Sequence, residues 1–168
     1  AAGLGVRVAK HGNRSFTSRS GSADVLEALG VVIDMSADAM ARTLEQAGIV
    51  FMFAPLMHPA LRHVGPVRRE LGVPTVMNIV GPLANPARAG RQVVGVAESS
   101  RLILLAEALA ALGSQRALVV HGAPGLDEVS PLGTTDVVEV HRGELTRWTI
   151  DPAIAEIDGV EPGDLAGG

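Results

Sequence analysis

The chain has 168 residues, of which 47% are hydrophobic, so it can fold around a sizeable core. Its formal net charge of −4 argues against nucleic-acid binding, and the lack of cysteine excludes disulfides, cysteine-bound zinc and a thiol nucleophile. The sequence shows no signal peptide and no apolar run of membrane-spanning length, so we expect a cytoplasmic protein that does not bind membranes.

The first predicted elements are a strand over residues 5–9, a polar loop over residues 10–24 and a helix over residues 25–30. The loop is rich in hydroxyl side chains and also carries glycines and cations. Backbone N–H groups, hydroxyls and a helix N-terminus can together hold a phosphate. The alternative is a solvated loop that Ser20 or Ser22 caps.

The rest of the chain alternates helices with strands. The predicted helices cover residues 37–47 (between Ser36 and Gly48), 58–71 with a break at Gly65-Pro66, 74–80, and 99–112. The predicted strands cover residues 49–53, 91–97 and 117–120, and a hairpin covers 136–140 and 145–150. Residues 81–86 are predicted to be a turn-rich connector. This order predicts the α/β class: a mostly parallel central sheet with helices on both faces and a late antiparallel hairpin.

Ligands of such sheets bind at the carboxyl ends of strands. The loop that begins at Lys10 and the pair Asp127-Glu128 both follow predicted strands, so we expect them to share one end of the sheet. Two adjacent carboxylates flanked by glycines are typical of a magnesium site, because Mg²⁺ takes one or two carboxylates plus waters and phosphates. The plainer alternative is an acidic dipeptide on an exposed turn.

Several polar side chains are candidates for substrate binding. Lys10 is a point charge suited to a phosphate, and Asn13 offers both a donor and an acceptor to a neutral polar substrate. His11 is suited to stack on or hydrogen-bond an aromatic substrate, unless it merely packs against a neighbouring turn. One of Arg68 and Arg69 could hold a carboxylate bidentately, although a helical arginine pair usually faces solvent. The histidines lack metal-ligand spacing, so we assign no zinc site.

Five stretches together resemble the anthranilate phosphoribosyltransferases of tryptophan biosynthesis: residues 10–24, 53–60, 67–72, 78–86 and 119–128. The match extends with consistent spacing from about residue 3 to about residue 150. The resemblance implies a nucleoside phosphorylase/phosphoribosyltransferase-like α/β domain. It also implies a glycosyltransferase that moves the phosphoribosyl group of phosphoribosyl diphosphate to the amine of anthranilate. Diphosphate is released, and magnesium neutralises its charge.

The resemblance further implies a role for each matched residue. Phosphoribosyl diphosphate would contact Lys10, Ser18 and Ser22, and the metal would bind Asp127 and Glu128. Anthranilate would contact Asn13 and Arg68, with Arg68 on its carboxylate, along a route lined by His11, His58 and Gly81. The full substrate-binding set is Lys10, His11, Gly12, Asn13, Arg14, Thr17, Ser18, Ser22, His58 and Arg68. Catalysis at a cationic ribosyl centre would be positioning and charge stabilisation, so no catalytic nucleophile or general base is assigned.

The chain also departs from the family pattern. The family has an N-terminal helical domain, a Gly-Thr-Gly-Gly-Asp loop and an Asn-x-Ser-Thr segment upstream of the motif at Lys10, and further helices at its C-terminal end. None of these is in the 168 residues. We therefore expect residues 1–168 to be a single partial α/β catalytic domain with little or no activity alone. The family homodimer would be formed largely by the N-terminal part that this chain lacks.

Three other functions remain open. A pyrimidine nucleoside phosphorylase shares the fold, but its loop resembles Lys-His-Ser-Gly-Arg, so Asn13 and the connector at residues 81–83 favour the transferase. A transferase-like protein that binds nucleic acid is disfavoured by the net acidity and by Asn13 and Arg68. The third alternative is a non-catalytic fragment that folds or binds ligand weakly.

Overall fold

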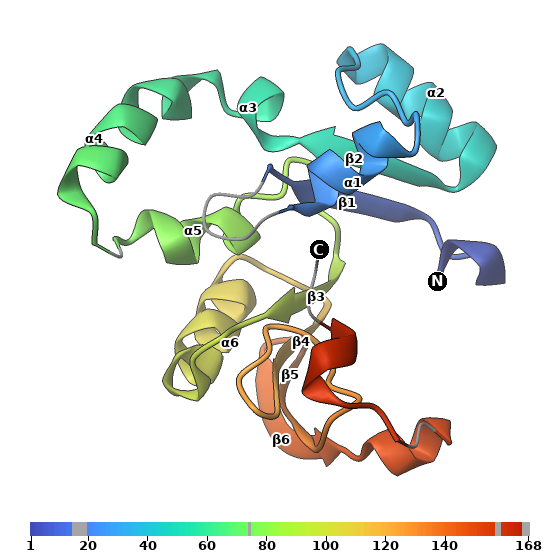
Figure 1. Ribbon diagram of the computed structural model, residues 1–168, viewed down its shortest axis with the longest axis vertical. Helices are drawn as coiled ribbons and strands as arrows, with labels where there is room; N and C mark the ends of the chain where they lie inside the picture. Colours follow the sequence, from blue (N-terminus) through green and yellow to red (C-terminus); the bar gives the residue numbers. More distant parts are fainter. Residues whose placement is uncertain (15–19, 74, 157–158, 166–168) are drawn as a thin grey trace. The chain divides into compact units, whose positions relative to one another are not determined.

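The computed structural model describes residues 1–14, 20–73, 75–156 and 159–165, without the side chains of Arg62, Arg68, Arg69 and Asn78. The chain divides into two compact units. Among the described residues, the first contains Ala1–Asn78 and Asn85–Ala87, and the second contains Ile79–Ala84 and residues 88–165. Figure 1 traces both units along the chain.

The first unit is built on two parallel strands, β1 (Val8–Gly12) and β2 (Ile49–Phe53). Val8 pairs with Ile49 and Gly12 pairs with Phe53, so the two strands end at the same level. The helices of this unit are α1 (Ser22–Ala28), α2 (Ala37–Ala47), α3 (Ala54–Met57) and α4 (Val64–Leu71), with 3-10 turns at Ala2–Leu4 and Pro59–His63.

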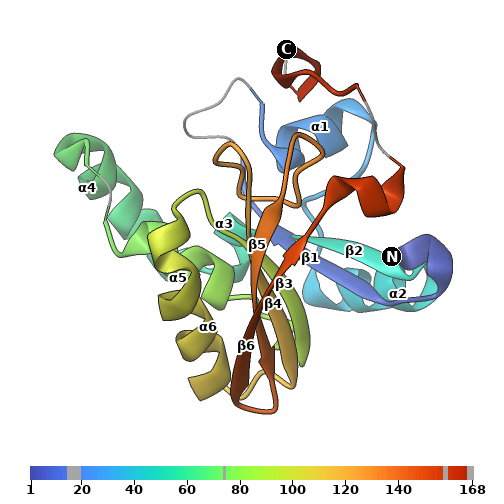
Figure 2. The ribbon, with the colours of Figure 1, turned by 90° about the horizontal axis from the view of Figure 1, so that it is seen from below.

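Helices cover both faces of this strand pair, because β2 is apolar at every position. On one face Phe51 packs with Ala23 of α1 and with Ile33. On the other face Val50 and Met52 pack with Met40 of α2. Figure 2 shows β1 and β2 lying between α1 and α2.

The second unit contains a mixed sheet of four strands in the order β3-β4-β5-β6. Its strands are β3 (Arg91–Gly95), β4 (Arg116–Gly122), β5 (Thr135–His141) and β6 (Glu144–Ile150). The pair β3–β4 is parallel, and the other two pairs are antiparallel. The other elements are α5 (Met77–Leu83), which begins in the first unit, α6 (Leu102–Ala111), and 3-10 turns at Ser99–Arg101, Pro152–Ala155 and Pro162–Leu165.

The core of the second unit lies between α6 and one face of its sheet. Leu105 and Leu109 of α6 pack against alternate residues of β4 and β5, including Val119 and Val138. Leu112, the last residue of the helix predicted at 99–112, instead follows the end of α6 and is exposed. In the part of the chain that the structure describes, no helix has the length and apolar character needed to cross a bilayer.

The predicted α/β class is confirmed: a parallel sheet is followed by a mixed sheet that ends in an antiparallel hairpin. The helix at Ala37–Ala47 and the strand at Ile49–Phe53 have the bounds that the sequence predicted. The strands, however, form two sheets. The strand before the polar loop and the strand before Asp127 therefore belong to different sheets. The prediction of a single partial domain stays a prediction.

The first strand starts later than predicted, at Val8 rather than residue 5. A 3-10 turn at Ala2–Leu4 ends at Gly5, whose φ of 82° is left-handed and suits glycine. Pairing with β2 then extends the strand to Gly12. The first three residues of the predicted loop, residues 10–12, are therefore strand residues.

Two other local predictions were wrong, and so was the alternative that Ser20 or Ser22 caps the loop before α1. Gly65-Pro66 does not break a helix but lies in the first turn of α4, where proline is tolerated because no N–H donor is needed. The predicted connector at residues 81–83 is the end of α5, and Pro82 lies one residue before that helix stops. The N-cap of α1 is Gly21, whose N–H donates to the Asp24 carboxylate at 2.8 Å.

Candidate functional site

The carboxyl ends of β1 and β2 bring two distant motifs together. Because the strands are parallel and in register, the residues after Gly12 and those after Phe53 emerge at the same end. His11 on β1 and His58 after α3 lie in contact, with their Nε2 atoms 3.2 Å apart. Their rings meet edge to face, with centroids 5.0 Å apart and planes at 76°. His11 and His58 thus bring the described parts of their two motifs together at the end of this strand pair.

The histidine pair is half-buried and constrains its own protonation. Burial and, secondarily, the charge of His58 lower the pKa of His11 from its usual 6.5. A hydrogen bond between two imidazole nitrogens needs one donor and one acceptor, so at least one ring is neutral. His11 thus packs against a residue that follows a neighbouring helix, and its contact with an aromatic substrate stays a prediction.

Arg14 ties the end of β1 to α1. Its guanidinium forms a two-pronged ion pair with Glu27, in which Nη2 lies 2.8 Å from Oε1 and Nη1 contacts Oε2. Asp24 lies 3.5 Å away, and the guanidinium carbon lies 5.4 Å from the centre of the Phe53 ring. The hydrogen bond to Glu27 is the main cause that raises the pKa of Arg14. Arg14 therefore fixes local structure here, and its contact with a substrate stays a prediction.

Gly12 allows α1 to approach the end of β1 closely. A Cβ at this position would lie 2.9 Å from two atoms of the Phe51 ring and 3.1 Å from the Ser22 hydroxyl. Ser22, the first residue of α1, is therefore beside Gly12. Lys10 is exposed on the same strand. Lys10, Gly12 and Ser22 thus lie where the end of β1 meets the start of α1.

For the remaining predicted residues of the first unit, the structure describes the side chain of Asn13 but not that of Arg68. The side chain of Asn13 is half-buried and accepts from the Arg14 N–H at 2.8 Å. Arg68 lies on α4, and its side chain is not among those described. Thr17 and Ser18 lie outside the described residues. Asn85, from the motif at residues 78–86, donates to the Ala9 carbonyl on β1 at 3.2 Å.

Asp127 and Glu128 lie on the loop between β4 and β5, and both are exposed. Gly122 and Leu126 exchange backbone hydrogen bonds of 2.8 and 2.7 Å at the start of this loop. Ser130 anchors its far side and is 2% exposed. Its N–H donates to the Thr135 hydroxyl at 2.9 Å, and its own hydroxyl donates to the Ala123 carbonyl. The acidic pair therefore lies on a hydrogen-bonded loop.

The donor set of this loop fits magnesium. Within the described ranges, no group of three or more histidine, aspartate or glutamate residues is arranged to hold a metal. Two hard carboxylates are what Mg²⁺ takes from a protein when waters and substrate phosphates complete its coordination. The loop also lies close to β3, since a Cβ at Gly95 would be 1.5 Å from the Asp127 carbonyl oxygen. Asp127 and Glu128 are thus the residues suited to hold the ion.

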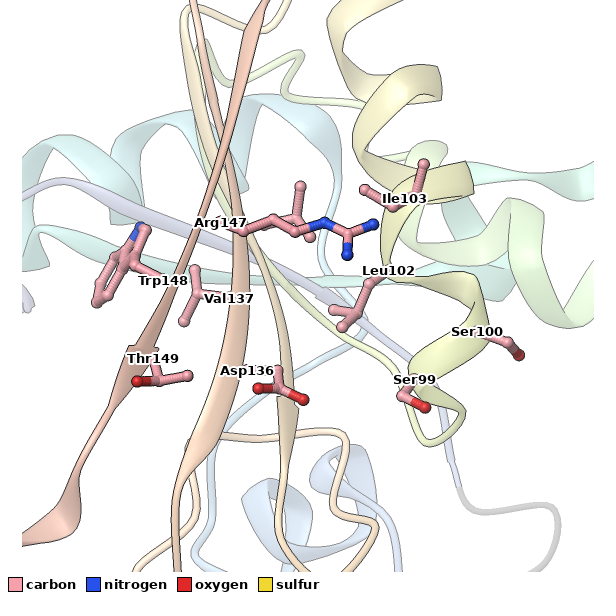
Figure 3. Close-up of a pocket in the computed structure, with 10 residues that line it drawn as sticks. Ser99, Ser100, Leu102, Ile103, Asp136, Val137, Arg147, Trp148 and Thr149 are labelled. Atoms are coloured by element: carbon pink, nitrogen blue, oxygen red, sulfur yellow. The ribbon is translucent and has the colours of Figure 1, made fainter.

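Two hollows in the structure lie away from the predicted residues. One, of about 270 Å³, is lined by apolar side chains of the first unit, including Met40 and Met52. The other, of about 550 Å³, lies between the start of α6 and the β5–β6 hairpin. Figure 3 shows Arg147 extending from β6 toward Leu102 and Ile103, while Trp148 lies on the other side of the strand. Neither hollow is lined by a residue of the predicted site.

Sequence reasoning missed several supporting residues. Glu27 and Phe53, which hold Arg14, gave no signal because a helical acid and a strand aromatic are ordinary. Gly95 did give one: a glycine inside an apolar strand often marks a close approach of another backbone. Ser130 and Thr135 are buried polar residues whose partners only the fold reveals.

Comparison with known sequences places the chain among glycosyl transferases. The pattern described as "Glycosyl transferase family, a/b domain" matches residues 1–168. An anthranilate phosphoribosyltransferase of Thermomicrobium roseum is 55% identical over 170 residues, which are 99% of this chain and 49% of that protein. One from Herpetosiphon aurantiacus is 56% identical over 154 residues, 91% of this chain and 46% of that protein. The chain spans about half the length of these curated relatives.

Solved structures agree with the sequences. An anthranilate phosphoribosyltransferase from Thermus thermophilus superposes with a TM-score of 0.89 at 48% identity, over 99% of this chain and 49% of that one. The enzyme from Saccharomyces cerevisiae, in complex with PRPP (phosphoribosyl diphosphate) and Mg, gives a TM-score of 0.85 at 30% identity. That match covers 97% of this chain and 45% of the yeast chain.

Proposed function

The chain belongs to the glycosyl transferase family through its a/b domain, and from that premise we propose that it is the central part of an anthranilate phosphoribosyltransferase. The observation that carries this proposal is the 55% identity to such an enzyme over 99% of the chain. In the proposed reaction the anthranilate nitrogen forms a bond to C1 of the ribose and later loses a proton. The bond from C1 to the diphosphate oxygen breaks, and diphosphate leaves with the electron pair.

The proposed acceptor site is at the carboxyl ends of β1 and β2. Anthranilate offers an aromatic ring, an amine and a carboxylate. His11 and His58, whose rings lie together at this end of the strands, would contact the aromatic ring. The lowered pKa of His11 favours its neutral form, so it does not repel the cationic ribosyl centre that forms nearby in this proposal. Asn13 would orient the amine, and Arg68 would hold the carboxylate bidentately.

The proposed donor contacts are to phosphates. Lys10 would pair with a phosphate as a point charge, and the hydroxyls of Thr17, Ser18 and Ser22 would donate hydrogen bonds to it. The close packing of Gly12 against Ser22 supports this role, because it places a hydroxyl beside the strand that carries Lys10. Arg14, bound to Glu27, would act by holding α1 in place.

Asp127 and Glu128 would hold the magnesium ion. When bound, the ion supplies positive charge that neutralises the leaving diphosphate. The remaining catalytic effect would come from holding the two substrates in register and from stabilising charge, without a covalent intermediate. We also propose that the protein acts in the cytoplasm as a homodimer.

Ligand binding tests the proposal without requiring turnover. We would titrate anthranilate into the chain with Mg²⁺ and phosphoribosyl diphosphate present, and compare Arg68→Ala with Arg69→Ala by calorimetry. Losing a bidentate, charge-assisted contact should weaken anthranilate binding about 10- to 100-fold in Arg68→Ala. Its neighbour Arg69 serves as a matched control and should bind as the wild type does. No binding by a folded wild-type chain, or equal binding by all three, would contradict the proposed acceptor site.

A further inference from the structure

Two strand glycines of the second unit lie directly under the loop that carries the acidic pair. A Cβ at Gly95 on β3 would be 1.5 Å from the carbonyl oxygen and 2.4 Å from the carbonyl carbon of Asp127. A Cβ at Gly122 on β4 would be 2.4 Å from the Glu128 carbonyl oxygen and 2.7 Å from the Ser130 Cβ. The backbone of both acidic residues therefore occupies space that any other side chain would fill.

This contact differs from ordinary glycine packing. The atoms that meet Gly95 belong to the backbone of Asp127, so an added methyl group must displace the loop or the strand. At Gly90, just before the same strand, a Cβ would meet only the side chain of Gln115, at 3.1 Å or more. That side chain is able to rotate away. Of these two glycines, only Gly95 lies against backbone atoms, and those atoms belong to Asp127.

The buried Ser130, whose Cβ also lies against Gly122, fixes the loop just after the acidic pair. Besides its bonds to Thr135 and Ala123, its hydroxyl accepts from the Leu132 N–H at 3.0 Å. Along the chain, Asp127 and Glu128 thus lie between Gly122 and this hydrogen-bonded anchor, and both residues are exposed. The backbone is held in place and the carboxylates face solvent.

We propose that Gly95, Gly122 and Ser130 are positioning residues that set where the carboxylates of Asp127 and Glu128 meet a divalent cation. The inference rests on the proposed function, which assigns the ion to these two residues. With two protein ligands, the ion must bind through few contacts and leave room for waters and phosphate oxygens. A small displacement of the loop should therefore weaken ion binding strongly, because changes to the residues that orient metal ligands lower metal affinity.

The test measures binding of Mn²⁺, a probe for Mg²⁺, by the electron paramagnetic resonance signal of the free ion. Each variant of the chain is studied at a temperature where circular dichroism shows it folded. We expect Gly95→Ala to raise the Kd for Mn²⁺ about 10-fold or more. Ser130→Ala adds no bulk and should also raise the Kd, whereas Gly90→Ala should leave it unchanged. If Gly95→Ala does not fold, Ser130→Ala decides the question.

The double variant Asp127→Asn with Glu128→Gln separates this inference from the proposed function. If that variant loses Mn²⁺ binding while Gly95→Ala and Ser130→Ala keep wild-type affinity, the metal assignment stands and the positioning role is refuted. If the double variant binds Mn²⁺ as tightly as the wild type, or the wild type binds none, the metal assignment fails and the positioning role fails with it.

Discussion

Substituting Gly12 by alanine tests the packing that brings α1 to the end of β1. The added methyl group would lie 2.9 Å from the ring of Phe51 and 3.1 Å from the Ser22 hydroxyl. The hydroxyl can rotate, but Phe51 is 6% exposed and packs against Ala23 and Ile33, so its ring has little room to move. Overpacking of this kind costs about 1–3 kcal/mol. For a chain of this length, that lowers the melting temperature by roughly 2–12 °C.

The assay is thermal unfolding followed by circular dichroism, with Gly65→Ala as the control. Gly65 lies in the first turn of α4, and nothing lies within 4 Å of a Cβ built there. That substitution should leave the melting temperature unchanged or raise it slightly, because alanine favours helix. Combining Gly12→Ala with Phe51→Leu should cost less than the sum of the two single changes, since the smaller side chain makes room. A Gly12→Ala chain as stable as the wild type would refute the reasoning.

Other predictions concern the histidine pair, the core and the Arg14 ion pair. Burial lowers the pKa of His11 below the 6.5 of the unfolded chain, so its contribution to stability is complete above pH 6.5 and is lost as the pH falls below that value. The melting temperature should therefore drop less between pH 7.5 and pH 5.5 in His11→Gln than in the wild type; an equal drop would contradict the pKa argument. Changing Leu109, which is 0% exposed, to alanine should lower the free energy of unfolding by about 2–5 kcal/mol, as measured by urea unfolding. The same change at Leu104, which is 53% exposed, should lower it far less. Glu27→Gln should change the melting temperature little, because the ion pair that links Arg14 to α1 is exposed and contributes little to overall stability; a large loss would contradict this.

Local signals in the sequence predicted much of the fold. Ser36 accepts from the Ala39 N–H at 3.3 Å and Gly48 has a φ of 71°, as the predicted ends of α2 require. The hairpin turn at Arg142-Gly143 has positive φ at both residues, which fits its position between two strands. Where the chain carries its own start and stop signals, the elements were predicted to within a few residues.

Strand partners and close contacts could not be predicted in this way. An apolar run indicates a strand but does not say which strand pairs with it, so the division into two sheets was not predicted. β1 was placed too early because its polar residues suggested a loop, although pairing with β2 extends it to Gly12. The contacts of His11 with His58, and of Gly95 with Asp127, join residues that only the fold brings together.

The most direct test of the central claim follows the imidazole signals of His11 and His58 by nuclear magnetic resonance. Anthranilate is added to the chain with Mg²⁺ and phosphoribosyl diphosphate, and thymidine with phosphate is added to a matched sample. If the site at the ends of β1 and β2 receives anthranilate, both signals shift with anthranilate and neither shifts with thymidine. Shifts with thymidine alone would instead support a pyrimidine nucleoside phosphorylase, and no shift with either ligand would contradict an acceptor site at this histidine pair.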